Sequence, residues 1–160
     1  MPALFQLRPA RAEDSPACRA LVNDALAEFD LQPDPDATDA DLNDVVAHYA
    51  ARGGDFVVLV NAMGAIVGTC GLYPFESSPG EPRTVELRKM YLSPTLRGQG
   101  QGRRLLDWAL VRARELGFRR VVLETSTKLR DAIALYERNG FVREGDGHCC
   151  RCDLSYTRDL

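Results

Sequence analysis

The hydrophobic positions along this chain change period several times, and each change marks a predicted element. Segments in which apolar and β-branched residues alternate with polar ones, or run together between turn residues, are typical of strands. Seven such segments predict strands at residues 4–8, 55–60, 65–73, 83–92, 119–124, 141–143 and 150–156. The turn sequence of residues 61–64, Asn-Ala-Met-Gly, separates the second and third strands, so we expect these two to pair as an antiparallel hairpin.

Apolar residues at helical spacing predict four helices between these strands. Ser15 and Pro16 suit the N-cap and first position of the first helix, and Thr38 with Asp41 resembles a capping pair for the second. The helices are predicted at residues 16–29, from the Thr38 cap to Gly53, at 103–116 and at 129–138. The order βααβββαβαββ indicates an α/β (α+β) fold with a mixed, mostly antiparallel sheet flanked by about four helices.

Length and charge limit the class of protein. A chain of 160 residues that is 45% apolar is predicted to form one domain, covering residues 1–160. No apolar run approaches the roughly 20 residues that cross a bilayer, and residues 1–5 lack the features of a signal peptide, so we expect a soluble, cytoplasmic protein without a membrane partner. A net charge of -3 offers no general attraction to nucleic acid.

The five cysteines are odd in number and lack the spacing of a disulfide framework. This disfavours a secreted domain held together by disulfide bonds and predicts free thiols. The sequence His148-Cys149-Cys150-x-Cys152 raises the hypothesis of a metal site. Alternation along a strand would separate Cys149 from Cys150 and Cys152, and no second pair of ligands lies elsewhere. We therefore expect no metal, and interpret these cysteines as small apolar strand residues.

The most informative segment is residues 97–102, Arg-Gly-Gln-Gly-Gln-Gly, which lies between a predicted strand and a predicted helix. Glycines let a ligand approach the backbone, and a helix start offers unpaired N–H groups and the positive end of a dipole. The junction therefore predicts a binding site for the pyrophosphate of a nucleotide-bearing cofactor.

Three known phosphate-binding loop motifs follow a strand, and the spacing of their conserved positions distinguishes them. A P-loop needs Lys and Ser/Thr after its last glycine, and neither follows Gly102. The dinucleotide fingerprint needs a third glycine where this chain has Arg103 or Leu105, which disfavours a dinucleotide-binding reductase. Glu124, at the end of the next predicted strand, would suit the ribose ligand of such a site, but the fingerprint itself is absent. The remaining pattern, Arg/Gln-x-x-Gly-x-Gly/Ala, fits Arg97, Gly100 and Gly102.

With this motif the chain resembles the GNAT superfamily of acetyl-CoA-dependent N-acetyltransferases. The resemblance begins at Glu86-Leu-Arg-Lys-Met-Tyr-Leu-Ser-Pro, runs through the loop and resumes at Ala132-Ile-Ala-Leu-Tyr-Glu-Arg-Asn-Gly-Phe141. The predicted element order also matches over nearly the whole chain. The resemblance implies a GNAT fold and acetyl-CoA as cosubstrate. One departure is Leu129, where many members carry a CoA-contacting asparagine; Lys128 or Arg130 could substitute.

The resemblance also implies which residues bind the cofactor. Backbone groups of Met90, Tyr91 and Leu92 would hold the pantetheine arm by a form of strand addition. The pyrophosphate would lie against the loop and the start of the next helix, which comprise Arg97, Gly98, Gln99, Gly100, Gln101, Gly102 and Arg103. Arg103 and Arg104 could equally be exposed charges at a helix start.

Attack on a thioester requires a neutral amine, yet an alkyl amine has a pKa of about 10.4, so a base must take its proton. Glu86 is the candidate, because it stands eleven positions before Arg97, the offset of the catalytic glutamate in histone acetyltransferases of this superfamily. Tyr136 matches the tyrosine that many members use as the acid for the leaving thiolate. The alternatives are a Glu86 that only pairs with Arg88, and a Tyr136 that only packs in the core.

The acceptor is expected between residues 29–49 and 74–83. The first stretch is acidic and would either attract a cationic acceptor or form a solvated surface; its acids are Asp30, Asp34, Asp36, Asp39, Asp41 and Asp44. Arg83 and Arg88 could instead bind a carboxylate. The favoured function is acetyl transfer to a primary amine of a small molecule or amino acid. Protein lysine or N-terminal acetylation, a non-catalytic acetyl-CoA-binding module and a homodimer stay open.

Overall fold

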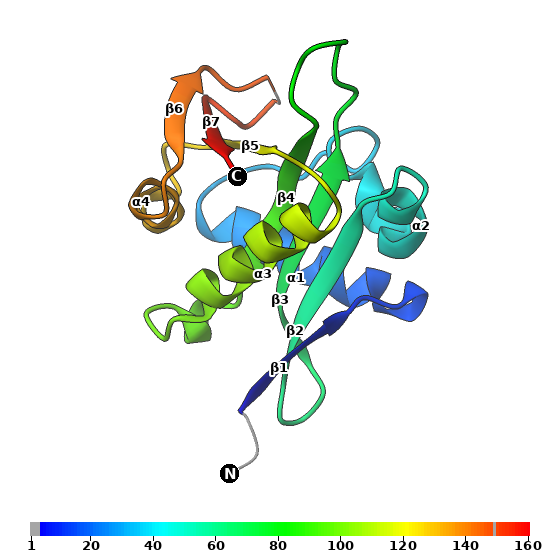
Figure 1. Ribbon diagram of the computed structural model, residues 1–160. Coiled ribbons are helices and arrows are strands. Elements are labelled where there is room, and N and C mark those ends of the chain that lie inside the picture. The colour runs from blue at the N-terminus through cyan, green and yellow to red at the C-terminus, as the bar shows by residue number, and fades with distance from the viewer. Residues whose placement is uncertain (1–3, 149) are drawn as a thin grey trace.

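The computed structural model describes residues 4–148 and 150–160, in which the strands form one sheet with helices on both faces (Figure 1). The strands are β1 Phe5–Pro9, β2 Asp55–Asn61, β3 Ile66–Pro74, β4 Thr84–Leu92, β5 Arg120–Thr125, β6 Val142–Gly145 and β7 Leu154–Asp159. The helices are α1 Ser15–Glu28, α2 Val45–Ala50, α3 Gln101–Glu115 and α4 Arg130–Arg138. The predicted element order is confirmed. None of the helices in these residues is long and apolar enough to span a membrane.

The sheet has the strand order β1-β2-β3-β4-β5-β7-β6, and every neighbouring pair is antiparallel except β4 with β5. The predicted hairpin of β2 and β3 is present. Its turn is held by the Asn61 side chain, which accepts hydrogen bonds from the N–H groups of Met63 (3.0 Å) and Ala65 (2.9 Å). Gly64 has φ +81, a conformation that glycine adopts without steric cost.

The continuous apolar run of β2 follows from burial on both of its faces. Val57 and Leu59 belong to the core beneath α3 and α4, which includes Leu105 and Leu106. The alternate residues Phe56, Val58 and Val60 belong to a second core beneath α1 and α2, which includes Val22, Leu26 and Tyr49. Both faces of the sheet are thus covered, and the sheet forms a rigid frame between them.

The second predicted helix is the main correction. A 3-10 turn over Ala40–Asn43 precedes the shorter α2, so the predicted Thr38 and Asp41 cap is wrong. Asp44 caps α2 instead, by accepting a hydrogen bond from the N–H of Ala47 at 3.0 Å. Asp41 is buried and accepts a 2.5 Å hydrogen bond from the Tyr49 hydroxyl, so its carboxylate is engaged inside the protein.

The last predicted strand also starts later than expected, at Leu154 instead of residue 150. The side chains just before it bind other loops, which holds this segment away from the strand ladder. Arg151 forms an ion pair with Asp39, and the Asp153 carboxylate accepts hydrogen bonds from the N–H and hydroxyl of Thr127.

The sheet splits between β4 and β5. The two strands pair only over Thr84–Glu86 and Arg120–Val122, and they part beyond this point. On the other side of β4, the register with β3 shifts between Thr69 and Gly71. The shift coincides with Lys89, whose φ of +52 lies in the left-handed region that non-glycine residues rarely adopt. A bulge at Lys89 therefore marks the part of β4 that β5 no longer pairs with.

A substitution at Gly71 tests how closely β3 packs against the Tyr49 ring of α2. A Cβ at this position would lie 2.7 and 2.8 Å from ring atoms of Tyr49 and 2.9 Å from the Phe56 ring. We expect Gly71→Ala to destabilise the protein by about 1–3 kcal/mol, because two buried rings must move. Gly145→Ala is the matched control, since a Cβ there meets nothing within 4 Å. Chemical denaturation measures both, and equal stabilities of the two variants would contradict this packing.

Candidate active site

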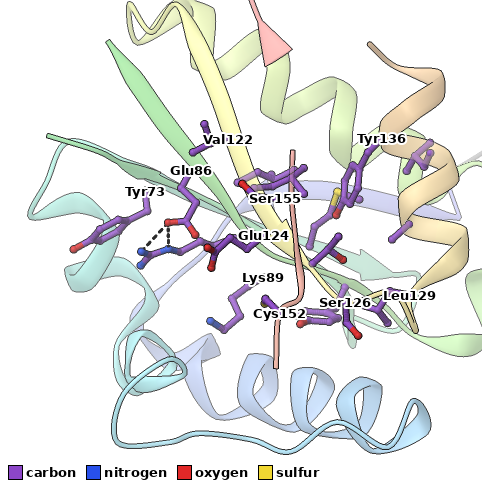
Figure 2. Close-up of a pocket in the computed structure, with 18 of the residues that line it drawn as sticks. Tyr73, Glu86, Lys89, Val122, Glu124, Ser126, Leu129, Tyr136, Cys152 and Ser155 are labelled. Carbon is purple, nitrogen blue, oxygen red and sulfur yellow. Dashed lines mark hydrogen bonds and ion pairs between the residues drawn. The ribbon is translucent and has the colours of Figure 1, made fainter. Parts of the chain in front are cut away.

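The split between β4 and β5 opens into a cleft of about 1260 Å³ (Figure 2). It extends from the glycine loop and α4 to the segment between α1 and α2. Most of the residues singled out in the sequence line it, namely Glu86, Met90, Tyr91, Leu92, Arg97, Gly98, Gly100, Gly102, Arg103 and Tyr136. Gln99 and Gln101 are not among its lining residues; the side chain of Gln99 donates to the Thr95 carbonyl at 2.9 Å.

The glycine loop has the conformation that an anion site requires. Gly98 and Gly100 have φ values of +75 and +77, and Gly100 is the N-cap of α3 without a side-chain cap. Because no side chain caps this end, the N–H groups of the first helical turn are available to a ligand. Gly102 is different, since a Cβ there would make ordinary contacts with Leu135 (3.4 Å) and Leu92 (3.5 Å). The backbone conformation thus requires glycine at positions 98 and 100, whereas Gly102 packs against the side chains of Leu135 and Leu92.

Arg97 is engaged with the end of α1. Its guanidinium forms an ion pair with Glu28, in which one nitrogen lies 2.6 Å from Oε2, and it lies 5.0 Å from the centre of the Phe29 ring. The pair lowers the pKa of the Glu28 carboxyl. In this state the charge of Arg97 is compensated by Glu28, so an anion on the loop would compete with that carboxylate.

The arginines at the start of α3 differ in role. Arg103 is exposed and forms an ion pair with Asp107 one turn along the helix, at 2.8 Å. Arg104 donates to the carbonyl of Phe5 at 2.9 Å and so ties α3 to β1. Arg103 therefore stays within reach of the loop, whereas Arg104 has a structural contact.

The start of α4 carries the departure from the family pattern. Leu129 is the N-cap residue and packs against the core beneath α1 and α2. The ammonium of Lys128 donates to the carbonyl of Asp30, just beyond α1, at 3.1 Å. A polar side chain at position 129 is thus replaced by an apolar contact between α4 and the opposite side of the cleft.

Glu86 lies on β4 where the strands part, with its carboxylate turned toward the cleft (Figure 2). Oε2 of Glu86 accepts a hydrogen bond from Nε of Arg88 at 2.8 Å and lies 2.8 Å from Nη2 of the same guanidinium in an ion pair. The Arg88 guanidinium lies 4.0 Å from the centre of the Tyr73 ring. Burial raises the pKa of Glu86, and the pairing with Arg88 only partly offsets this. The contact with Arg88 that the sequence suggested is present, and Glu86 lines the cleft as well.

Tyr136 lies on α4 at the opposite wall of the cleft from Glu86. Its ring packs against Phe141 at 5.6 Å and is 6% exposed. Within the described residues its hydroxyl has no hydrogen-bond partner. Burial raises the pKa of the phenol above its ordinary value, so the group stays protonated at neutral pH. Core packing and access to the cleft are therefore both properties of this residue.

A buried ionic network joins the acceptor segment to β4. The Lys89 ammonium lies 3.3 Å from Asp39 and 3.2 Å from Asp41, and it donates to the carbonyl of Thr38 at 3.0 Å. Arg151, from the loop between β6 and β7, pairs with Asp39 through contacts of 2.6 and 2.8 Å. Burial alone would raise the pKa of Asp39, but these partners hold it below its ordinary value. Asp39 and Asp41, two acids of the stretch expected either to attract a cationic acceptor or to form a solvated surface, are therefore buried inside the protein.

Two other sequence interpretations change. Arg83 donates to the carbonyls of Leu116 (3.3 Å) and Gly117 (3.4 Å) and covers the Phe118 ring, so it is not a residue of the main cleft. Cys18, Cys70 and Cys150 carry free thiols, whereas Cys152 is disulfide-bonded, which corrects the prediction of free thiols throughout. The described residues contain no group of three or more side chains that could hold a metal ion. Cys149, a member of the sequence His148-Cys149-Cys150-x-Cys152, lies outside them.

The fold and the cleft together define an acyltransferase of the GNAT type. Residues 18–141 match the family model described as the Acetyltransferase (GNAT) family, and the chain belongs to this family. The resemblance noted in the sequence is thus confirmed, and with it the GNAT fold.

Relatives and a solved structure agree with this assignment. An uncharacterised N-acetyltransferase of Escherichia coli K12, YjgM, is 38% identical over 96% of this chain and 94% of its own length. The aminoalkylphosphonate N-acetyltransferase of Salmonella typhimurium is 32% identical, with 85% and 84% covered. A phosphinothricin acetyltransferase of Sinorhizobium meliloti, solved in complex with acetyl-CoA, superposes with a TM-score of 0.76 at 24% identity, covering 98% of this chain and 89% of that one.

The buried network should be a large contributor to stability. Lys89→Met removes the ammonium and leaves Asp39 and Asp41 buried with a reduced number of cationic partners, so we expect a loss of about 3–5 kcal/mol in the free energy of unfolding. Lys128→Met, at an exposed lysine, is the control and should change stability by less than about 0.5 kcal/mol. Urea denaturation measures both. Equal, small effects would show that the network is not a stabilising element.

Proposed function

We propose that this protein transfers the acetyl group of acetyl-CoA to a primary amine of a small molecule or amino acid. The observation that carries the proposal is a single cleft that connects the glycine loop with Glu86 and Tyr136. The names of two relatives support a small acceptor: one acetylates an aminoalkylphosphonate, and the other, phosphinothricin.

The residues present fit acetyl-CoA, which supplies the acetyl group as a thioester. The left-handed Gly98 and Gly100 and the uncapped start of α3 suit a pyrophosphate. The backbone of Met90, Tyr91 and Leu92 lies beyond the last β4–β5 pair, so its polar groups on that side are available to the amides of the pantetheine arm. A backbone N–H at Met90 or Tyr91 would also stabilise the oxyanion.

Glu86 and Tyr136 divide the proton transfers. An acceptor amine arrives mainly as an ammonium ion, and the Glu86 carboxylate, directly or through a water, accepts its proton. A raised pKa makes Glu86 a stronger base than an ordinary carboxylate. Tyr136, protonated at neutral pH and without a competing hydrogen bond in the described chain, donates to the departing thiolate.

The direct test incubates the protein with acetyl-CoA and a panel of amines, with mass spectrometry of the products. The panel includes amino acids, polyamines, aminoglycosides, aminoalkylphosphonates and lysine peptides. Mass spectrometry avoids the interference of protein thiols with dye assays. Acetylation of one small-molecule class supports the proposal, whereas acetylation of peptides alone would redirect it to a protein acceptor. Tight binding of acetyl-CoA without any product would indicate a binding module.

Substitution of the two catalytic candidates gives a second test. Glu86→Gln and Tyr136→Phe should each lower kcat by roughly 10²- to 10⁴-fold while acetyl-CoA still binds, because each variant removes one proton transfer. The kcat/KM of the unsubstituted protein should fall as the pH is lowered through the pKa of Glu86, which lies above its ordinary 4.5, because protonation removes the base. A Glu86→Gln variant that kept this acid limb and full activity would exclude Glu86 as the base.

The ion pair between Arg97 and Glu28 gives a third test. Glu28→Gln should tighten acetyl-CoA binding by about two- to fivefold, since Arg97 no longer exchanges one anion for another. Asp24→Asn, on the exposed side of the same helix, removes the same charge without touching Arg97 and is the control. Calorimetric titration measures both. Weaker binding by Glu28→Gln would show that Glu28 helps to position the arginine.

A further inference from the structure

Glu124 is a carboxylate in the cleft that the proposed chemistry does not use. It lies on β5, two residues beyond Val122, which is the last β5 residue paired with β4. Because side chains alternate along a strand, Glu124 is on the same face as Val122 and projects from the part of β5 that has separated from β4. Figure 2 shows Glu86 and Glu124 directed toward the same region of the cleft from neighbouring strands.

Four cations on β4, on β5 and in the loop before β7 already have a carboxylate partner. Lys89 pairs with Asp39 and Asp41, and Arg151 pairs with Asp39. Arg88 pairs with Glu86, at 2.8 Å. Arg120, which also lines the cleft, pairs with Asp159 at 2.8 Å. The positive charge of this end of the cleft is therefore compensated by other acids before Glu124 is counted.

Glu124 has no such partner. In the described chain no cationic side chain lies within ion-pair distance of it, and its Oε1 accepts one hydrogen bond, from the backbone N–H of His148 at 2.7 Å. It is partly buried and lies close enough to Glu86 to raise the pKa of that group. A partly buried carboxylate beside a second carboxylate is unfavourable unless a cation joins them.

We propose that Glu124 is the docking group for the ammonium form of the acceptor, so that the cleft selects amines that arrive with a positive charge. An ammonium beside Glu124 compensates its charge and stands next to Glu86, which then takes the proton. The inference rests on the proposed function for its choice of ligand, and it adds a residue and a charge preference to it. It also means that Arg88, which pairs with Glu86, is not the group that positions the acceptor.

The test uses two probes of equal size and opposite charge, n-butylammonium and butyrate, with the protein saturated by CoA so that no turnover occurs. Binding is followed by chemical-shift changes in NMR spectra. We expect n-butylammonium to bind more tightly than butyrate. Glu124→Gln should weaken n-butylammonium about tenfold, a loss typical of a charged hydrogen bond, and leave CoA affinity unchanged. Glutamine keeps an oxygen for the His148 N–H, so the loop contact is preserved.

Glu144→Gln is the matched control, because Glu144 is an exposed glutamate on β6 that lines the same cleft. It should leave n-butylammonium binding unchanged. Preferred binding of butyrate, or equal affinities of Glu124→Gln and the unsubstituted protein for n-butylammonium, would overturn the inference and leave Glu124 as an anchor for the loop before β7. The comparison of the two probes on the unsubstituted protein stands even if the variant does not fold.

The proposed function fails in a different way. Failure to bind CoA, or CoA binding without acetylation of any amine in the panel, counts against the transferase and leaves the charge preference of the cleft to be judged by the probes alone.

Discussion

The separation of β4 from β5 is the constraint on which the site depends. Parallel strands that stay paired leave no room for a ligand between them, and here the pairing ends after Glu86 and Val122. The bulge at Lys89 accompanies the separation, and its left-handed backbone costs free energy that the surroundings must offset. The carbonyl of Lys89 accepts from the Thr69 hydroxyl at 2.7 Å, and its ammonium is held by two buried carboxylates. The same residue thus shapes the strand and fastens the acceptor segment to it.

This arrangement links the two ends of the cleft. Asp39 and Asp41 belong to the segment between α1 and α2, and Arg151 belongs to the loop before β7. The network around Lys89 therefore joins both loops to β4, the strand proposed to bind the pantetheine arm. At the other end, Arg97 forms an ion pair with Glu28 in the last turn of α1, and Lys128 donates to the carbonyl of Asp30. The segment that frames the acceptor is therefore attached at both ends to elements expected to bind the cofactor.

Local sequence was sufficient for the order of the elements and for the glycine loop, because periodicity and turn residues act over a few positions. The starts of α2 and β7 were placed wrongly, since they depend on contacts with distant segments. Gly98 and Gly100 adopt the positive φ values for which a glycine loop is used. The partners of charged residues could not be predicted in this way. Arg97 meets Glu28 and Arg151 meets Asp39 across 69 and 112 positions of the chain, and only the fold brings them together. The one local sign of the buried network was a lysine at position 89, where the alternation of Val85 and Leu87 along the strand calls for a buried apolar residue.

A crystal structure of the protein with acetyl-CoA would show directly whether the cofactor occupies the split between β4 and β5. We expect the pyrophosphate on the N–H groups of residues 98–103, the pantetheine arm along Met90 to Leu92, and the thioester in the split between Glu86 and Tyr136. A cofactor bound outside the split, or a glycine loop that makes no contact with the pyrophosphate, would contradict this expectation.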